Sequence, residues 1–236
     1  SDEVNRGVSL VTFFGHSSPG STDLDIGNAS NAVNNYKNKG KYPVILMNGC
    51  NAGNAFVPTK VSFGEDWLKT PDRGAVALIA HVDAGYPNFL NLYTSNFYST
   101  AFQDPVFYGK SLGEVQQETI RRVTKTTANS LAVAMVMEMA LQGDPALKLY
   151  TPAKPDYLIE DSGFKVESFT DELVTASADS FMISIEVNNL GKAITDSVYV
   201  SVRRVLPDNS VVVTDSLIAG AILKRQVLKL KLSNKD

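Results

Sequence analysis

The chain contains one thiol and two imidazoles, and two of these three side chains are placed to work together. Cys50 is the single cysteine of the 236 residues, and His16 and His81 are the two histidines. A thiol with a pKa of about 8.5 is mostly protonated at neutral pH, and a nearby imidazole can accept its proton. The thiolate attacks a carbonyl carbon, and backbone N–H groups near Gly15 and Cys50 could stabilise the resulting oxyanion.

The elements that must position these residues are strands of a buried sheet. Short apolar runs bounded by turn residues predict strands over residues 8–14, 42–48 and 74–80. Helical patterns occur over residues 65–69, 90–102, 112–124 and 128–141, and a last strand is predicted over 146–150. Strands that alternate with helices indicate an α/β sandwich with a mostly parallel sheet. His16 and Cys50 then lie at the carboxyl ends of two successive strands, where ligands bind in such sheets.

Each of these residues also has a plainer interpretation. A single cysteine at a strand end is often a small buried hydrophobic residue, and a histidine after a glycine is often a turn residue. His81 also follows a predicted strand and competes with His16 as the base. It ranks second because no glycine turn flanks it, and it is assigned to the wall of the substrate pocket instead. The matching positions of His16 and Cys50 favour the catalytic interpretation.

The second part of the chain has a different pattern. Residues 151–156 contain two prolines and predict a stiff linker, which divides the chain into domains over 1–152 and 153–236. Apolar residues alternate with polar ones after the linker, so we expect about five strands in a small β-sandwich of immunoglobulin type. Such domains usually have seven strands, and an apolar strand begins close to residue 1. We therefore expect a piece of a longer protein, truncated at both ends.

Composition excludes several classes of function. Lys and Arg total 22 against 25 Asp and Glu, a net charge of −3, which argues against a dedicated nucleic-acid-binding protein. One cysteine excludes an internal disulfide and a cysteine-cluster metal site. No apolar run reaches the roughly 18 residues of a membrane span. Asp23, Asp25 and Asn28 carry oxygen ligands of the kind calcium prefers, but their spacing fits no EF-hand. No cofactor or metal is predicted, with calcium as the open alternative.

A series of longer motifs is far more specific than any single residue. In order, the chain contains Phe13-Phe-Gly-His-Ser-Ser18, Met47-Asn-Gly-Cys-Asn-Ala-Gly53, Phe63-Gly-Glu-Asp-Trp-Leu68, Gly74-Ala-Val-Ala-Leu-Ile-Ala80, Ser111-Leu-Gly-Glu114 and Gly143-Asp-Pro-Ala-Leu-Lys-Leu149. Over about residues 8–150 this series resembles the gingipain-like cysteine peptidases, family C25 of the caspase-like clan. The resemblance implies a caspase-like α/β/α sandwich followed by an immunoglobulin-like domain.

The resemblance also implies roles for individual residues. Cys50 matches the nucleophile and His16 the catalytic histidine, with backbone amides of Gly15 or Ser17 and of Cys50 as oxyanion donors. The loop over residues 81–87 matches a wall of the specificity pocket, which implies pocket roles for His81, Asp83 and Tyr86. Ser17 stands where the family has glycine. The acid that orients the histidine lies upstream of it in the family, where this chain has only Asp2 and Glu3.

The form of the Gly-His-Ser-Ser loop, followed by Asp23 and Asp25, resembles relatives associated with the type IX secretion system of Bacteroidetes. Some of these are sortases at the cell surface. The resemblance implies a protein or peptide substrate, secretion-system components as partners, and secretion or attachment to the outer membrane of a Gram-negative bacterium. An unpaired thiol suits such an oxidising compartment. Two alternatives stay open: a peptidase-like scaffold without turnover, and an adhesion module in which the β-sandwich is the functional part.

Overall fold

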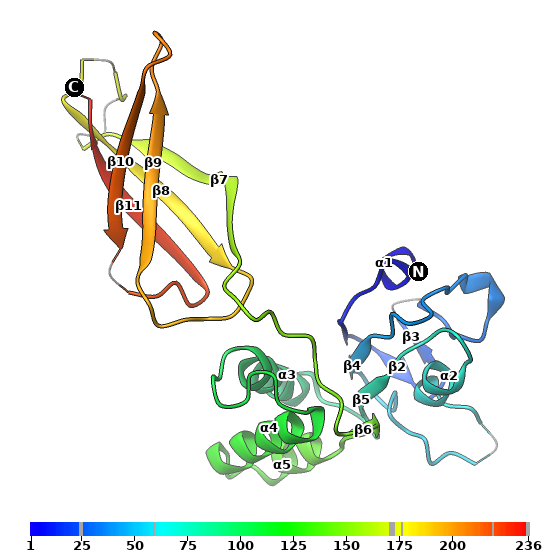
Figure 1. Ribbon diagram of the computed structural model, residues 1–236. Coiled ribbons are helices and arrows are strands. Elements are labelled where there is room, and N and C mark those ends of the chain that lie inside the picture. Colours follow the sequence, from blue (N-terminus) through cyan, green and yellow to red (C-terminus); the bar gives the residue numbers. More distant parts are fainter. Residues whose placement is uncertain (24–25, 59, 170–172, 176, 219, 235–236) are drawn as a thin grey trace. The chain divides into compact units, whose positions relative to one another are not determined.

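The described residues form two compact units. The computed structural model describes residues 1–23, 26–58, 60–169, 173–175, 177–218 and 220–234. The first unit is Ser1–Tyr150 and the second is Thr151–Asp236. The predicted domain boundary, after residue 152, lies two residues beyond this division. Both units are drawn in Figure 1.

A four-stranded sheet forms the centre of the first unit, with strand order β1-β4-β5-β6. Strands β1 (Leu10–Phe14), β4 (Val44–Asn48) and β5 (Ala77–His81) run parallel, and β6 (Met139–Gly143) runs antiparallel along β5. The mostly parallel α/β sheet predicted from the sequence is therefore confirmed. All residues of β4 and β5 are buried, as expected for strands covered on both faces.

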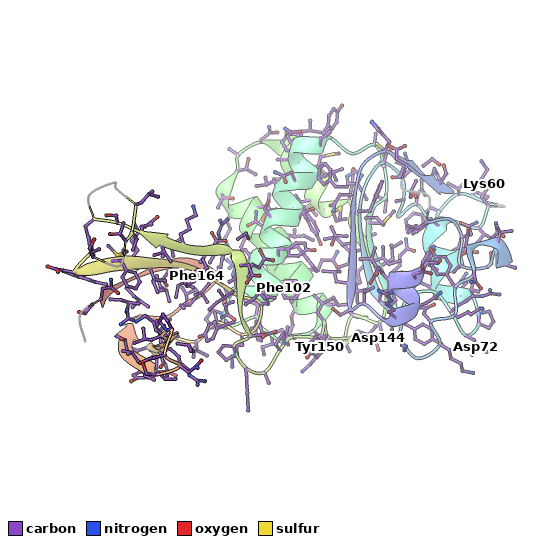
Figure 2. All side chains as sticks on the ribbon, turned by 90° about the horizontal axis from the view of Figure 1, so that it is seen from above. Lys60, Asp72, Phe102, Asp144, Tyr150 and Phe164 are labelled. Atoms are coloured by element: carbon purple, nitrogen blue, oxygen red, sulfur yellow. The ribbon has the colours of Figure 1, made fainter. Side chains whose placement is uncertain are left out.

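Alternate residues of the central strands enter two separate hydrophobic cores. Val44 and Leu46 pack in a core with helices α3 (Pro87–Phe102), α4 (Leu112–Thr126) and α5 (Ser130–Met137). Ile45 and Met47 pack on the other face, in a core that includes α2 (Phe63–Lys69). Figure 2 shows the sheet of this unit from above, between the helical layer and the layer that contains α2. The period of two in a strand produces this three-layer arrangement.

Local signals at the helix starts explain where the helices begin. The Ser62 and Glu65 side chains form a capping box at the start of α2, and Ser111 with Glu114 forms another at α4. Pro87 occupies the first turn of α3, where its missing N–H is not needed. The Asn129 side chain accepts hydrogen bonds from two amides of α5. A short helix α1 (Asp2–Arg6) precedes the sheet.

The predicted end of this unit was wrong in two places. The helix predicted over residues 128–141 ends at Met137, and Met139–Gly143 forms the edge strand β6. The strand predicted over 146–150 is replaced by one isolated bridge between Ser111 and Lys148. A short apolar run fits a buried helix and a buried strand equally well. Pairing with β5 decides the matter, because it satisfies the backbone of Met139–Gly143 in the sheet.

Four charged side chains form a partly buried network beside α4. Glu118 is buried, and its carboxylate accepts hydrogen bonds from Arg121 Nε at 2.5 Å and from Arg122 Nε at 2.8 Å. Arg122 also pairs with Asp104. Both arginines are therefore paired with carboxylates. Their side chains hold the pKa of Glu118 down to about 2, against the desolvation that raises it.

This network predicts a pH-dependent stability. The Glu118 pKa is lowered from an ordinary 4.5 to about 2, so its contribution is complete above pH 4.5 and is lost as the pH falls towards 2. Glu118→Gln is expected to lower the free energy of unfolding by about 2 kcal/mol at neutral pH. The difference from the unsubstituted protein should shrink between pH 4.5 and 2.5, as measured by urea unfolding. Glu160→Gln, at an exposed carboxylate, is the control, and a difference that does not change with pH would contradict the assignment.

The second unit contains five described strands, as expected, in two antiparallel sheets. Strands β7 (Tyr157–Glu167), β8 (Ser180–Asn189) and β11 (Arg225–Ser233) form one sheet, and β9 (Val198–Val205) pairs with β10 (Val211–Ile218) in the other. Apolar side chains of β8 and β11 form a core against which Val198, Val200 and Val202 of β9 pack. The immunoglobulin type of this unit stays a prediction. Among the described residues of the chain, no helix is long and apolar enough to cross a membrane.

Candidate active site

His16 and Cys50 follow two adjacent parallel strands of the sheet. Gly15 and His16 come directly after β1, and Gly49 and Cys50 come directly after β4. Phe14 and Asn48, the last residues of these strands, lie opposite each other in the parallel ladder. Both loops therefore leave the same edge of the sheet side by side. His16 is exposed and Cys50 is partly buried.

The two loops are joined by direct contacts. The Gly15 amide donates to the Asn48 carbonyl at 3.1 Å, and the Ser17 hydroxyl donates to the Cys50 carbonyl at 2.8 Å. A Cβ atom on Gly49 would lie 2.1 Å from Ser17 Oγ and 2.7 Å from the Gly15 oxygen. This approach is possible only because residue 49 has no side chain. Ser17, which differs from the family glycine, thus ties the histidine loop to the cysteine loop.

A buried asparagine fixes the end of β4. The Asn48 side chain is fully buried; its Nδ2 donates to the Phe13 carbonyl at 3.1 Å, and its Oδ1 accepts a hydrogen bond from Thr94 Oγ1 at 2.7 Å. It therefore ties β1 to helix α3 two residues before Cys50. Sequence reasoning missed this role. The available signal was an amide side chain at the end of an otherwise apolar strand, since buried polar groups require partners.

Asp23 holds the backbone of the histidine loop. Its carboxylate accepts a hydrogen bond from the His16 amide at 3.1 Å, and its own amide donates to the His16 carbonyl at 3.0 Å. Asp25 lies outside the described residues, and calcium binding here stays a prediction. Of the two upstream acids, Glu3 pairs with Arg6 in α1 at 3.0 Å. In the described part of the chain, no carboxylate has a recorded hydrogen bond or ion pair with the His16 ring.

The predicted oxyanion donors differ in their availability. The Gly15 amide is already bonded to the Asn48 carbonyl, because the β1–β4 ladder continues one residue past the strand. The Cys50 amide has no recorded acceptor among the described residues. An N–H group without an internal acceptor, next to the sulfur, is the arrangement that oxyanion stabilisation requires. The site therefore offers Cys50 N–H more directly than Gly15 N–H.

The predicted pocket loop touches the cysteine, through a residue that sequence reasoning missed. The Gly85 amide donates to Cys50 Sγ at 3.3 Å, and the Asn51 amide donates to the Asp83 carbonyl at 2.9 Å. Asp83 and Tyr86 are exposed, as a pocket wall requires. His81 is fully buried, with its Nε2 3.3 Å from Glu138 Oε2. Its side chain therefore lies beneath the loop and not at its surface.

Comparison with known proteins assigns the chain to a family. Residues 1–150, which carry both loops, match the profile of peptidase family C25. The chain belongs to this family. No curated protein matches the C25 chain, but solved structures do. The Arg-specific cysteine proteinase gingipain R superimposes with a TM-score of 0.56 at 17% identity, over 97% of this chain and 54% of that one.

A second solved structure gives the same result for the C25 chain. The complex of Porphyromonas gingivalis RgpB pro- and mature domains matches with a TM-score of 0.54 and 16% identity, over 97% of this chain and 55% of that one. At identities this low, the two matches show the fold alone. The C25 chain spans about half the length of these solved relatives.

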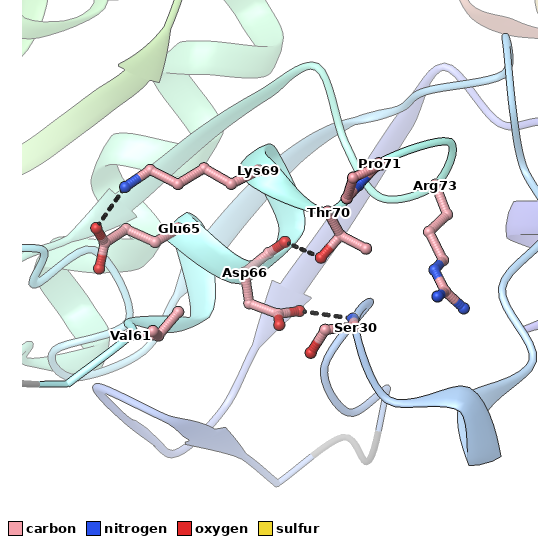
Figure 3. Close-up of a pocket in the computed structure, with 8 residues that line it drawn as sticks. All are labelled: Ser30, Val61, Glu65, Asp66, Lys69, Thr70, Pro71 and Arg73. Carbon is pink, nitrogen blue, oxygen red and sulfur yellow. Dashed lines mark hydrogen bonds and ion pairs between the residues drawn. The ribbon is translucent and has the colours of Figure 1, made fainter.

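A surface pocket along α2 contains none of the predicted site residues (Figure 3). Five of its lining residues are bonded to one another. Glu65 pairs with Lys69 at 2.8 Å, the Asp66 carboxylate accepts from the Ser30 amide at 3.1 Å, and Thr70 Oγ1 donates to the Asp66 carbonyl at 2.7 Å. Glu65 and Asp66 lie in the first turn of α2, where acidic side chains stabilise the helix dipole.

Proposed function

We propose that the protein is a cysteine endopeptidase in which Cys50 is the nucleophile and His16 the general base. The observation that carries this proposal is the pair of linked loops, Gly15–Ser17 and Gly49–Cys50, at adjacent strand ends of a family C25 chain. The exposed His16 ring is free to approach a substrate and the neighbouring thiol. His81 is a poor alternative because it is fully buried and its Nε2 faces Glu138.

The reaction follows from these positions. His16 takes the proton of the Cys50 thiol, and the thiolate adds to the carbonyl carbon of the scissile peptide. The oxygen that becomes negative accepts a hydrogen bond from the Cys50 amide. Protonated His16 then gives its proton to the leaving amine as the C–N bond breaks, which leaves a thioester. Attack by water or by an acceptor amine, with His16 again as the base, releases the acyl group and restores the thiol.

The cellular setting forms part of the same proposal. The resemblance of the Gly-His-Ser-Ser loop to proteins of type IX secretion supports a role in processing secreted proteins. The substrate is then a protein or peptide, and the partners are components of the secretion system. The proposed location is outside the cell or on the outer membrane of a Gram-negative bacterium.

A scaffold without turnover is the second candidate. It is favoured by Ser17, which stands where the family has glycine and donates a hydrogen bond from its hydroxyl to the Cys50 carbonyl. The absence of a recorded carboxylate contact to the His16 ring among the described residues points the same way. In that case the peptidase fold would bind secretion partners and leave them intact.

A covalent probe separates the two candidates. The full-length protein is incubated with a peptidyl acyloxymethyl ketone, digested, and analysed by mass spectrometry. We expect the modified residue to be Cys50, with labelling blocked by prior treatment with iodoacetamide. The scaffold candidate is favoured if the native protein is not labelled although its thiol still reacts with iodoacetamide. Labelling that occurs equally in the urea-unfolded protein would also contradict the peptidase proposal, because it would need no active site.

A further inference from the structure

His81 and Glu138 form a pair, with the two facing atoms buried, that the proposed reaction does not use. His81 is the last residue of β5 and its side chain is completely buried. Its Nε2 lies 3.3 Å from Oε2 of Glu138, the residue between α5 and β6. Within the described part of the chain, neither of these two buried atoms makes a hydrogen bond. The two atoms therefore face each other directly, at 3.3 Å.

The other ring nitrogen of His81 holds the loop that follows it. Nδ1 lies 2.7 Å from the carbonyl oxygen of Asp83. A carbonyl can only accept, so this contact places the hydrogen on Nδ1. The Asp83 amide lies 3.3 Å from the same nitrogen, and the shorter contact decides which partner is bonded. The ring therefore closes the turn over residues 81–83 from inside.

The loop held in this way is the one that reaches the sulfur of Cys50. The Asp83 carbonyl also accepts from the Asn51 amide at 2.9 Å, and the His81 carbonyl accepts from the Gly53 amide at 2.9 Å. Two residues beyond Asp83, the Gly85 amide donates to Cys50 Sγ at 3.3 Å. A chain of contacts thus runs from Glu138 through the His81 ring and Asp83 to the groups around the thiol.

We propose that His81, anchored by Glu138, is a positioning residue that sets the 81–85 loop so that the Gly85 N–H is directed at the Cys50 sulfur. The importance of this for catalysis rests on the proposed function. The Gly85 N–H, 3.3 Å from the sulfur, favours the thiolate, whereas the Gly85 carbonyl, 3.7 Å from the sulfur, accepts from the protonated thiol. The N–H contact is the shorter of the two, and it needs no reorganisation during the reaction. His81 acts through the loop and does not touch the reacting atoms. Glu138 can hold the ring against Asp83 when Nε2 also carries a hydrogen, because a bare Nε2 and the carboxylate are both acceptors.

Two substitutions of similar size separate positioning from simple packing. His81→Asn keeps an N–H donor near the position of Nδ1, whereas His81→Leu has none. Amide hydrogen exchange at Gly85, followed by NMR in the full-length protein, should be accelerated roughly tenfold or more in His81→Leu. It should return to within about threefold of the unsubstituted protein in His81→Asn. Glu138→Gln should give an intermediate increase. Amides of β4 serve as the internal reference for global stability.

The same exchange rates can also overturn the proposal. Equal Gly85 exchange in His81→Leu and in the unsubstituted protein would show that the ring does not hold the loop. Equal acceleration in His81→Leu and His81→Asn, matched by the same acceleration in β4, would show a role in packing alone. The amide measurement does not depend on turnover. If the peptidyl probe fails to label Cys50 but Gly85 exchange behaves as expected, the proposed function fails and the positioning role stands.

Discussion

His16→Ala in the full-length protein is expected to slow peptide hydrolysis by about 10²- to 10⁴-fold at neutral pH, the usual contribution of a general base. Cys50→Ala should abolish turnover, because it removes the sulfur that attacks the carbonyl carbon. His16 lies at an exposed loop and its ring has no recorded structural contact among the described residues, so its removal should leave the fold intact. The measurement is kcat/KM with a peptide substrate, together with the rate of labelling by the peptidyl probe.

The pH dependence shows whether a base has been lost. Without the imidazole, hydroxide from the solvent must take the thiol proton, and its concentration rises with pH. The defect of His16→Ala should therefore diminish between pH 7 and about pH 9. Ser18→Ala is the matched control. Ser18 lies two residues after His16, in the hairpin of β2 (Ser17–Ser18) and β3 (Ser21–Thr22), and its hydroxyl contacts Ser21 Oγ at 2.7 Å. It should retain activity within about twofold. Equal labelling of His16→Ala and the unsubstituted protein would disprove the proposed dyad.

The strand ends were predictable because they depend on local rules. An apolar run followed by Gly15 or Gly49 predicts a buried strand and a tight turn, and the parallel arrangement brings successive strand ends to one edge. Residues of β4 and β5 are apolar on both faces, so their assignment did not depend on register. The sequence could therefore locate His16 and Cys50 at one edge of the sheet before any distance was known.

The contacts around the thiol depend instead on partners that are distant in the sequence. Gly85 carries no side chain, so a residue pattern cannot indicate what its amide contacts. In the structure that amide donates a hydrogen bond to the Cys50 sulfur. Glu138 falls inside the helix predicted over residues 128–141, but the helix ends at Met137 and the Glu138 carboxylate lies 3.3 Å from His81. The pairing of Met139–Gly143 with β5 brings Glu138 beside His81, and local propensity does not encode that pairing.

Ser17 illustrates how a departure from the family pattern is accommodated. Its hydroxyl lies where a Cβ on residue 49 would otherwise be, and donates to the Cys50 carbonyl. The serine thus requires Gly49 beside it. Taken together, the two residues set the separation of the histidine and cysteine loops, on which proton transfer between their side chains would depend.

The closeness of these loops leads to a second large expected effect. In Gly49→Ala, the new Cβ would lie 2.1 Å from Ser17 Oγ and 2.7 Å from the Gly15 oxygen. The hydroxyl can rotate away, at the cost of its hydrogen bond to Cys50. The Gly15 carbonyl belongs to the backbone and can yield only by moving the histidine loop. We expect a loss of kcat/KM of about 10²-fold, the usual result of displacing catalytic groups by about 1 Å. Urea unfolding should show a destabilisation of about 1–3 kcal/mol from overpacking.

Two further variants show whether the clash itself is responsible. Gly20→Ala is the control, because Gly20 lies in the turn that follows the histidine loop and its Cβ would meet nothing within 4 Å. It should retain activity and stability. Ser17→Gly combined with Gly49→Ala removes the contact at 2.1 Å and keeps the one at 2.7 Å, so it should recover part of the stability but not the full activity. Activity of Gly49→Ala within twofold of the unsubstituted protein would mean that the spacing of the two loops does not govern the reaction. The relative positions of the Cys50 and His16 side chains would then not depend on Gly49.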